Sequence, residues 1–253
     1  WLKDLVTGTE GTITKAPGSF VYDKNTYYDM TADLDTRAYD GMYYMWDAQE
    51  QYWKGYEWTK HLLGNTGQPT LSGGSSSNDP QSNADPRYWN ESYPGYGTSN
   101  PAIHSCKDLP NANEMTWYAA NDPCWDDFEL WTTMGHLYRG GMWFKKKSNI
   151  SGFNPNTAVD GTDWRITTNS QTWPVSYTLP SVADANNYFY LPTLGYYRFG
   201  QLYNVGHIGD YWSSSAYPWN SGGSTAYNLN FVSNYVNVSN FNRFFGFWVG
   251  AFK

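Results

Sequence analysis

The residue types that most often carry out chemistry are thinly spread in this chain. Its four histidines, His61, His104, His136 and His207, lie far apart in the sequence, and no Cys-x-x-Cys motif is present. A metal site built from closely spaced His and Cys ligands therefore has no support in the spacing. We interpret the histidines as separate structural or surface residues, with His136 in the middle of a helix and in the core.

The sequence also gives no clear pattern of catalytic carboxylates or of a catalytic nucleophile. Glu50, Glu57 and Asp163 could form a carboxylate pair for sugar hydrolysis, but their spacing does not select them. No serine lies in the glycine-flanked motif of a nucleophile elbow. We therefore expect no catalytic residue, no metal and no cofactor, and we expect that the protein is not an enzyme.

Two states are open for the two cysteines, Cys106 and Cys124. A disulfide between them would imply an oxidising compartment. Two buried free thiols agree equally well with the sequence. No further cysteine follows Cys124.

The composition favours a protein that binds through its surface. Aromatic residues make up 19% of the 253 residues and charged residues only 15%, which is typical of a loop-rich recognition protein. The net charge of −7 argues against a nucleic-acid partner, because such binding needs a basic stripe. No apolar run approaches the length of about 20 residues that a transmembrane helix needs, so direct membrane insertion is not expected.

Residues 211–253 show the clearest pattern in the chain and contain no acidic residue, histidine or cysteine. Apolar and polar residues alternate over 227–231 and 236–238, which predicts two strands joined as a hairpin by a turn at 232–234. The inward set is Tyr227, Leu229, Phe231, Val236 and Val238. The outward set is Asn228, Asn230, Tyr235, Asn237 and Ser239. A third strand is predicted at 247–251, with Phe247 and Val249 inward and Trp248 outward.

Three phenylalanines, Phe241, Phe244 and Phe245, lie in the polar loop 240–246 that precedes this third strand. They either fold back on the core as a small separate cluster or form part of an exposed recognition surface. The second alternative is the hypothesis that we favour, because aromatic side chains supply a large contact area at a low cost in rotamer entropy.

The remainder of the chain divides into a lead-in and one domain. Residues 1–38 are interpreted as a lead-in segment or a linker from a larger protein, with an edge strand at 11–14. Residues 39–253 are interpreted as one domain, in which the Gly, Ser, Asn and Pro content of 64–102 predicts a surface excursion. Further strands are predicted at 42–46 and 188–192.

Two helices are predicted from their start signals. Asn111 with Glu114 forms the first N-cap pair, and Pro123 blocks continuation of that helix beyond Ala120. Asp126 with Glu129 forms the second such pair. Helical spacing follows it at Phe128, Trp131, Met134 and Tyr138.

Four segments carry a resemblance to a known family: LPTLGYY at 191–197, YWSSS at 211–215, AYNLNF at 226–231 and GFWV at 246–249. These segments resemble the C-type-lectin-fold proteins of Bacteroidales and their phages. The text LPNANEM at 109–115 and LWTTMGHL at 130–137, from the two predicted helices, resembles the surface or fimbria-associated members. Some of those proteins are variable proteins diversified by diversity-generating retroelements, and the fold is shared with formylglycine-generating enzymes. The resemblance covers residue 109 to the end. It implies an α+β fold of C-type-lectin type with two helices, short antiparallel strands and long loops.

The resemblance also implies a ligand-binding region at 191–253, because retroelements mutate Asn codons to many other residues in such regions. Trp219 and Trp248 cannot arise from those codons, so they are either fixed or arise in another way. Together, the resemblance and the strand pattern mark these candidate ligand-binding residues: Arg198, Phe199, Tyr203, His207, Ile208, Asp210, Trp219, Tyr235, Asn237, Phe241, Phe244, Phe245 and Trp248.

Two motifs of the families that this sequence resembles are missing from it, which narrows the expected function. The late cysteine pair of the formylglycine-generating enzymes is missing, and Trp89-Asn90-Glu91 is only a weak echo of the calcium-dependent sugar motif. The resemblance therefore implies an extracellular adhesion or ligand-binding module, on the bacterial cell surface or on a phage virion. Its expected partner is a protein or glycan on another cell or host surface. The alternatives are a structural subunit of a pilus or phage tail fibre, and a non-variable carbohydrate-binding lectin.

Overall fold

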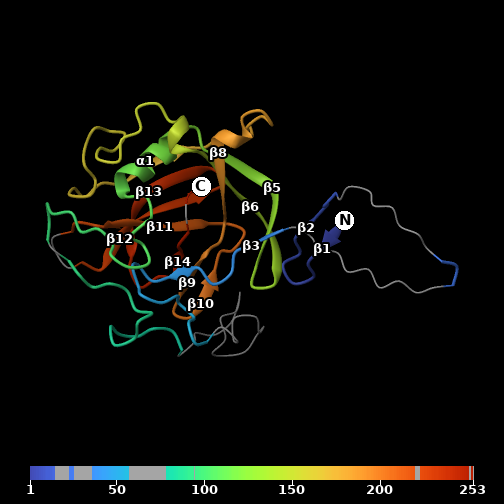
Figure 1. Cartoon of the computed structure of the whole chain (residues 1–253), viewed down its shortest axis with the longest axis horizontal. Coiled ribbons are helices and arrows are strands. Elements are labelled where there is room, and N and C mark those ends of the chain that lie inside the picture. Colours follow the sequence, from blue (N-terminus) through green and yellow to red (C-terminus); the bar gives the residue numbers. More distant parts are fainter. Residues whose placement is uncertain are drawn as a thin grey trace.

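Two β-sheets carry most of the fold (Figure 1). The computed structural model describes residues 1–14, 23–25, 36–56, 78–93, 95–219, 223–250 and 252. The larger sheet has the strand order β4 (Tyr43–Tyr44), β14 (Phe247–Trp248), β11 (Gly209–Ala216), β12 (Thr225–Val232), β13 (Tyr235–Asn242) and β7 (Gln171–Pro174). The smaller sheet has the order β3 (Arg37–Ala38), β5 (Cys124–Thr133), β6 (His136–Lys145) and β8 (Tyr188–Pro192).

The main hydrophobic core includes side chains from one face of each sheet. Phe144 of β6 contacts Phe231 of β12 edge to face, with the ring centroids 5.6 Å apart. Burying a large apolar side chain of this kind contributes about 1.5–3 kcal/mol. We call the face of the larger sheet that contributes Phe231 to this core its inner face, and the opposite face its outer face.

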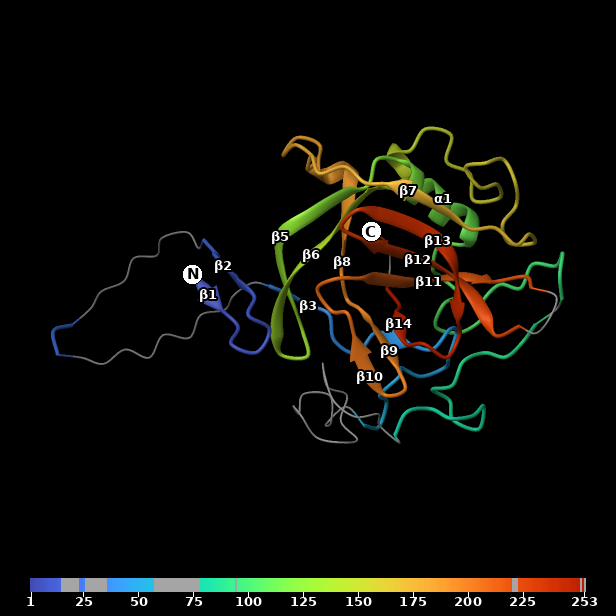
Figure 2. The ribbon, with the colours of Figure 1, turned by 180° about the vertical axis from the view of Figure 1, so that it is seen from behind.

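The predicted C-terminal hairpin is confirmed. Strands β12 and β13 pair in antiparallel register from Thr225 opposite Asn242 to Val232 opposite Tyr235, so that the connecting turn is only two residues long. Figure 2 shows the two strands side by side between β11 and β7. All five residues of the predicted inward set are fully buried on the inner face, because alternate side chains of a strand point to opposite sides of the sheet.

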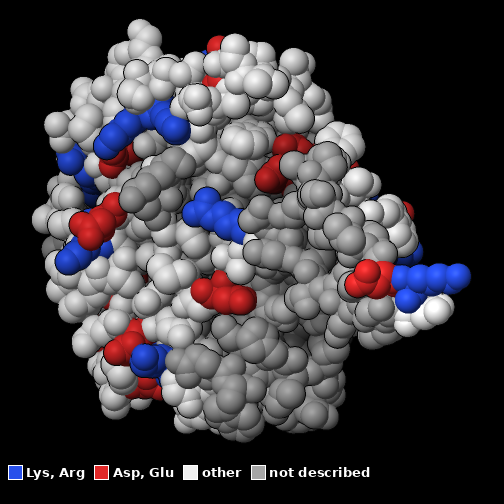
Figure 3. All heavy atoms as spheres, turned by 45° about the vertical axis from the view of Figure 1, so that its right-hand side comes forward, with Lys and Arg blue, Asp and Glu red and all other residues white. Residues whose placement is uncertain are grey.

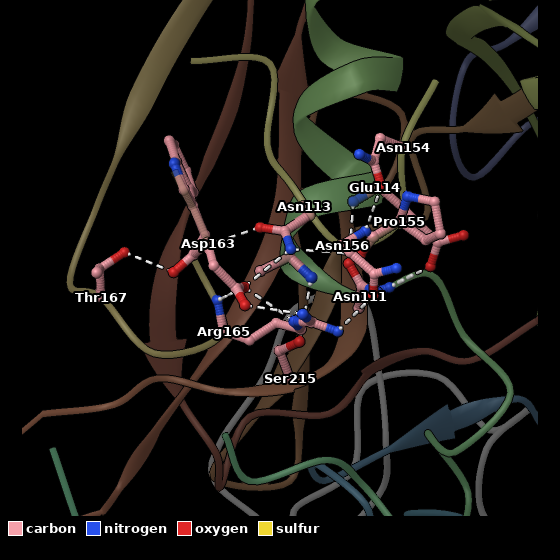
Figure 4. A network of polar contacts seen from close by, with 12 residues as sticks. Asn111, Asn113, Glu114, Asn154, Pro155, Asn156, Asp163, Arg165, Thr167 and Ser215 are labelled. Carbon is pink, nitrogen blue, oxygen red and sulfur yellow. Dashed lines mark hydrogen bonds and ion pairs between the residues drawn. The ribbon is translucent and has the colours of Figure 1, made fainter. Parts of the chain in front are cut away.

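The first predicted helix is also confirmed as α1 (Ala112–Ala120). Asn111 accepts a hydrogen bond from the backbone N–H of Glu114, and the Glu114 carboxylate accepts one from the backbone N–H of Asn111, which completes a capping box. Figure 4 shows how the same helix start holds the 154–167 loop. Asn113 donates to Asp163, whose carboxylate is also bound by the Arg165 guanidinium.

The second predicted helix is wrong, and with it the expectation of an α+β fold with two helices. Residues 124–145 form the hairpin β5–β6, and α1 is the one α-helix of the part of the chain that the structure describes. Asp126 does accept the backbone N–H groups of Phe128 and Glu129, as an N-cap would, but here it caps an irregularity between Asp126 and Leu130 in strand β5. A short polar side chain can make this local hydrogen bond in either setting.

The hairpin turn at Met134-Gly135 explains the rest of this error. Both residues have positive φ, 53° and 76°, as the two central residues of a type I′ turn require. Thr133 pairs with His136 directly across this turn. His136 therefore starts a strand and does not lie in the middle of a helix.

The third predicted strand exists as β14, but its faces are the reverse of the prediction. Phe247 stacks on Trp212 on the outer face, with the ring centroids 4.1 Å apart. Trp248, predicted to point outward, packs against Tyr39 and Tyr211 in the main core. The reason is that part of the outer face carries a second hydrophobic cluster, so that both faces of the sheet are buried here.

Several short elements complete the described chain. The strands β9 (Tyr196–Arg198) and β10 (Gln201–Tyr203) form a hairpin inside the 194–210 segment. The predicted strands at 188–192 and 42–46 correspond to β8 and to the shorter β4. The 3₁₀ turns are η2 (Lys147–Asn149) and η3 (Ala185–Asn187).

The N-terminal residues pair with each other and contact the smaller sheet. Strands β1 (Leu2–Lys3) and β2 (Glu10–Gly11) pair in antiparallel fashion, so the predicted edge strand at 11–14 is reduced to its first residue. Asp4 accepts a hydrogen bond from the backbone N–H of Leu137 and lies 3.2 Å from the His136 ring nitrogen. Burial raises the Asp4 pKa, but these contacts and two further backbone N–H donors outweigh it and bring the pKa down to about 2.

Close packing in the β6–β8 pair gives the first testable prediction. A Cβ atom at Gly141 would lie 2.4 Å from the Tyr190 ring and 2.6 Å from the Leu191 carbonyl oxygen. We expect Gly141→Ala to lower the free energy of unfolding by about 3 kcal/mol, as overpacking does. Gly161→Ala, where φ is +85° and the surroundings are open, is expected to cost only about 1 kcal/mol. Urea denaturation measures both, and equal losses would contradict the packing argument.

Candidate functional site

A row of polar side chains crosses the outer face of the larger sheet. Asp210 of β11 pairs with Asn230 of β12, and Asn230 pairs in turn with Asn237 of β13. Asn237 lies opposite Thr172 of β7. Asn230 and Asn228 both donate from their amide nitrogens to Asp210 Oδ1, at 2.9 and 3.0 Å. Asn237 donates to Thr172 Oγ1 at 2.7 Å.

This row lies in a cavity of about 440 Å³, within the size range of small-molecule sites. We call it the asparagine pocket. It is lined by Thr172, Tyr196, Ile208, Asp210, Asn228, Asn230, Tyr235, Asn237, Ser239 and Phe241. Five of these, Ile208, Asp210, Tyr235, Asn237 and Phe241, are among the candidate residues marked by the sequence.

Asp210 is the acidic residue of the pocket and is only 3% exposed. Burial raises the pKa of its carboxyl to about 7, because the charged form loses its hydration. The hydrogen bonds from Asn230 and Asn228 act in the opposite direction and lower the pKa. The protonation state of this carboxyl therefore changes near neutral pH.

Two amide oxygens of the pocket have no hydrogen-bond partner in the protein: Asn228 Oδ1 and Asn237 Oδ1 are both buried. The Asn228 amide is held in this orientation because its nitrogen donates to the same Asp210 oxygen that accepts from Asn230. Leaving a buried polar group unpaired costs about 1–3 kcal/mol. The outer face of the sheet thus retains two unused hydrogen-bond acceptors within the pocket.

A continuous line of aromatic contacts borders the asparagine pocket, and we call it the aromatic ridge. From Phe199 through Phe244, Phe245, Phe241 and Tyr196 to Tyr203, the successive ring centroids are 5.7, 4.7, 4.7, 6.4 and 5.7 Å apart. Phe199 is 50% exposed and Phe241 is 36% exposed, whereas Phe245 is buried. Phe241 lies in β13, so the predicted loop at 240–246 starts later than expected. Both alternatives considered for the three phenylalanines apply to part of the set.

Arg198 places a positive charge on this ridge. Its guanidinium lies over the Phe199 ring at 4.9 Å and the Phe245 ring at 5.4 Å, in cation–π geometry. The described residues on the face drawn in Figure 3 show acidic and basic side chains scattered among uncharged ones. An exposed arginine stacked on aromatic rings is a common feature of protein binding surfaces.

The structure does not bring all candidate residues together. His207 is exposed and lines a different cavity, beside Trp125, Tyr138 and Arg139. Trp219 stacks on Tyr217, at the other end of β11. Trp248 packs in the main core, as described above. The remaining candidates, Arg198, Phe199, Tyr203, Ile208, Asp210, Tyr235, Asn237, Phe241, Phe244 and Phe245, line the asparagine pocket or belong to the aromatic ridge and its arginine.

Five residues of the pocket were missed as site residues. Asn228, Asn230 and Ser239 belonged to the outward set of the hairpin, so the signal for them was present in the alternation. Tyr196 and Thr172 carried no such signal. The place of Thr172 depends on the pairing of β7 with β13, and that of Tyr196 on the bridge between Tyr197 and Gly246.

The residues with catalytic potential do not form a second site among the described residues. Asp163 is held by Arg165, whose hydrogen bonds lower the Asp163 pKa. Cys106 and Cys124 are both free and buried, and burial raises the pKa of each thiol. His61 and Glu57 lie outside the described residues.

Comparison with known proteins supplies no relative. No protein-family model, curated protein or solved structure matches the chain. Among the described residues, no helix has the length and apolar character needed to cross a membrane. The same residues contain no group of three or more His, Cys, Asp or Glu side chains that could hold a metal ion.

The buried carboxyl of Asp210 gives a pH-dependent prediction. Because its folded-state pKa of about 7 lies above the unfolded value of about 4, the folded state binds more protons between these limits. Its stability relative to Asp210→Asn should therefore fall as pH rises from about 4 to 7, by up to roughly 4 kcal/mol, and then level off. Urea denaturation at several pH values measures this difference, and a flat or rising difference over that range would contradict it.

A second prediction concerns metal. Because no ligand cluster lies among the described residues, we expect EDTA to leave the melting temperature unchanged within the error of the measurement. A metal bound only to the folded state would stabilise it by mass action. A fall of several degrees on chelation, reversed by adding Ca²⁺, would show that this expectation is wrong.

Proposed function

We propose that the chain is a ligand-binding or adhesion module that uses the asparagine pocket and the aromatic ridge as one recognition face. The observation that carries this proposal is their continuity. Tyr196 and Phe241 line the pocket and are also members of the ridge. A ligand seated in the pocket would therefore contact the exposed rings as well.

The chemistry of this face suits recognition better than catalysis. Exposed aromatic rings and a stacked arginine give contact area, and the polar pocket gives directional hydrogen bonds. The proposed ligand is a protein or glycan on another cell or host surface, and the proposed location is the outside of a bacterial cell or a phage virion. These follow from the resemblance described above, with the face as their structural support.

Diversification by a retroelement belongs to the same proposal. In the β12–β13 hairpin, the inner-face residues Leu229, Phe231, Val236 and Val238 are fully buried, whereas the outward positions line the pocket. Substitutions at the outward positions would change the ligand while the core remains the same. A reverse-transcriptase gene next to this one, with a near-repeat of its 3′ end, would support the proposal, and their absence from the locus would count against it.

The recognition face is tested by two matched variants. We expect the double variant Phe199→Ala and Phe241→Ala to weaken ligand binding by about tenfold or more, because exposed aromatic anchors dominate binding energy. Its melting temperature should fall less than that of a variant at a fully buried ring, since Phe199 is 50% and Phe241 36% exposed. Phe245→Ala, in the same ridge but buried, should instead lower stability by about 3–5 kcal/mol.

Binding is measured on an array that carries glycans and cell-surface proteins in separate spots, with thermal melting of each variant in parallel. Retention of every array signal by the folded double variant would show that the ridge is not part of the recognition surface.

A further inference from the structure

We infer that the asparagine pocket binds a neutral, hydroxyl-rich ring, such as the terminal uncharged sugar residue of a glycan. This inference rests on the proposed function and names the class of ligand for one part of the recognition face. It follows from the charge, the hydrogen-bonding capacity and the shape of the pocket.

The charges of the pocket disfavour an anion. None of the described residues that line it is Lys, Arg or His, and its floor contains the Asp210 carboxyl. The amide nitrogens of Asn228 and Asn230 each direct one N–H group at Asp210 Oδ1. An acidic sugar or a phosphate would lie beside the Asp210 carboxyl with no cationic side chain in the lining, since Arg198 belongs to the ridge.

The unused hydrogen-bond acceptors of the pocket favour a ligand with hydrogen-bond donors. Asn228 Oδ1 and Asn237 Oδ1 are buried acceptors without a partner. Asn228 itself is fully buried, and its orientation is fixed by Asp210. Asn237 is only half-buried, and a small rotation of its side chain, of the kind that accompanies binding, would bring a ligand hydroxyl to its Oδ1. Such a donor would satisfy an oxygen that the folded protein leaves unpaired.

The walls of the pocket supply the apolar part of the fit. Tyr196 and Phe241 lie on one side, with ring centroids 6.4 Å apart, and Tyr235 and Ile208 also line the cavity. A pyranose ring has C–H groups on its faces and hydroxyl groups at its edge. The C–H faces can pack against the aromatic side chains of the lining, and the hydroxyl groups can bond to its polar side chains. The volume of about 440 Å³ lies near the lower end for ligand sites, which favours one sugar residue over a longer buried chain.

The test titrates the full chain with single sugars by calorimetry or ligand-observed NMR. The neutral probes are glucose, galactose, mannose and N-acetylglucosamine. Glucuronic and galacturonic acids are the acidic counterparts of the first two. We expect at least one neutral sugar to bind with a Kd in the millimolar range, which is about −4 kcal/mol, and the acids to bind at least about tenfold more weakly.

Two variants locate the binding. Asn237→Ala removes one unpartnered acceptor at a half-buried outward position and should weaken the sugar that binds by about tenfold, an effect typical of a lost hydrogen bond to a buried group. Phe128→Ala, an exposed ring on β5 of the smaller sheet and outside the pocket lining, should leave single-sugar affinity unchanged. Thermal melting confirms that both variants are folded.

The outcomes separate this inference from the proposed function. Failure of all neutral sugars to bind, equal binding of the acids, or an unchanged affinity of Asn237→Ala overturns the neutral-sugar assignment. If array binding is nonetheless lost in the Phe199 and Phe241 double variant, the recognition face stands with a different ligand. If array binding is also retained in that variant, the proposed function fails as well.

Discussion

A single buried side chain, that of Asp47, holds together two loop segments of the 78–109 region. Asp47 is fully buried with φ at +53°, and its oxygens accept the backbone N–H groups of Ile103, His104 and Cys106 at 2.7–3.2 Å. The Asn90 amide donates to it as well, at 2.7 Å. Loops that lack a β-ladder must satisfy their buried N–H groups in another way. Here one side chain does so for two separate segments of the 78–109 region.

A second buried polar side chain, that of Arg243, connects these loop segments to the recognition face. The Arg243 guanidinium lies 4.3 Å from the Trp46 ring and donates to the carbonyl oxygens of Asn90, Ser92 and Thr225. Burial lowers its pKa to about 10, so it remains charged at neutral pH. Arg243 follows the end of β13 and directly precedes two phenylalanines of the aromatic ridge. The loop that presents those rings is thereby fixed at its start to the same irregular segments that Asp47 organises.

The sequence predicted the local features of this structure better than the long-range ones. Alternation over 227–238 assigned the inner and outer faces of the β12–β13 hairpin correctly, and the Asn111 capping box placed α1. The same capping signal failed at Asp126, because a polar side chain can cap a strand irregularity as well as a helix. Alternation also failed for Trp248, since it cannot show that both faces of β14 are covered. The asparagine pocket needed cross-strand register: Asp210 and Thr172 meet the hairpin only through the pairings of β11 and β7.

The two-residue turn between β12 and β13 has a consequence for how this chain can evolve. The turn fixes the register of eight consecutive pairs, and a shift of one residue would move Leu229 and Val238 from the core to the solvent side. The hairpin therefore tolerates exchange of outward side chains but not a change in length. Related chains should keep a constant number of residues between Thr225 and Asn242 even where their outward residues differ. Insertions and deletions should accumulate instead in the longer loops between strands, where no pairing register depends on them.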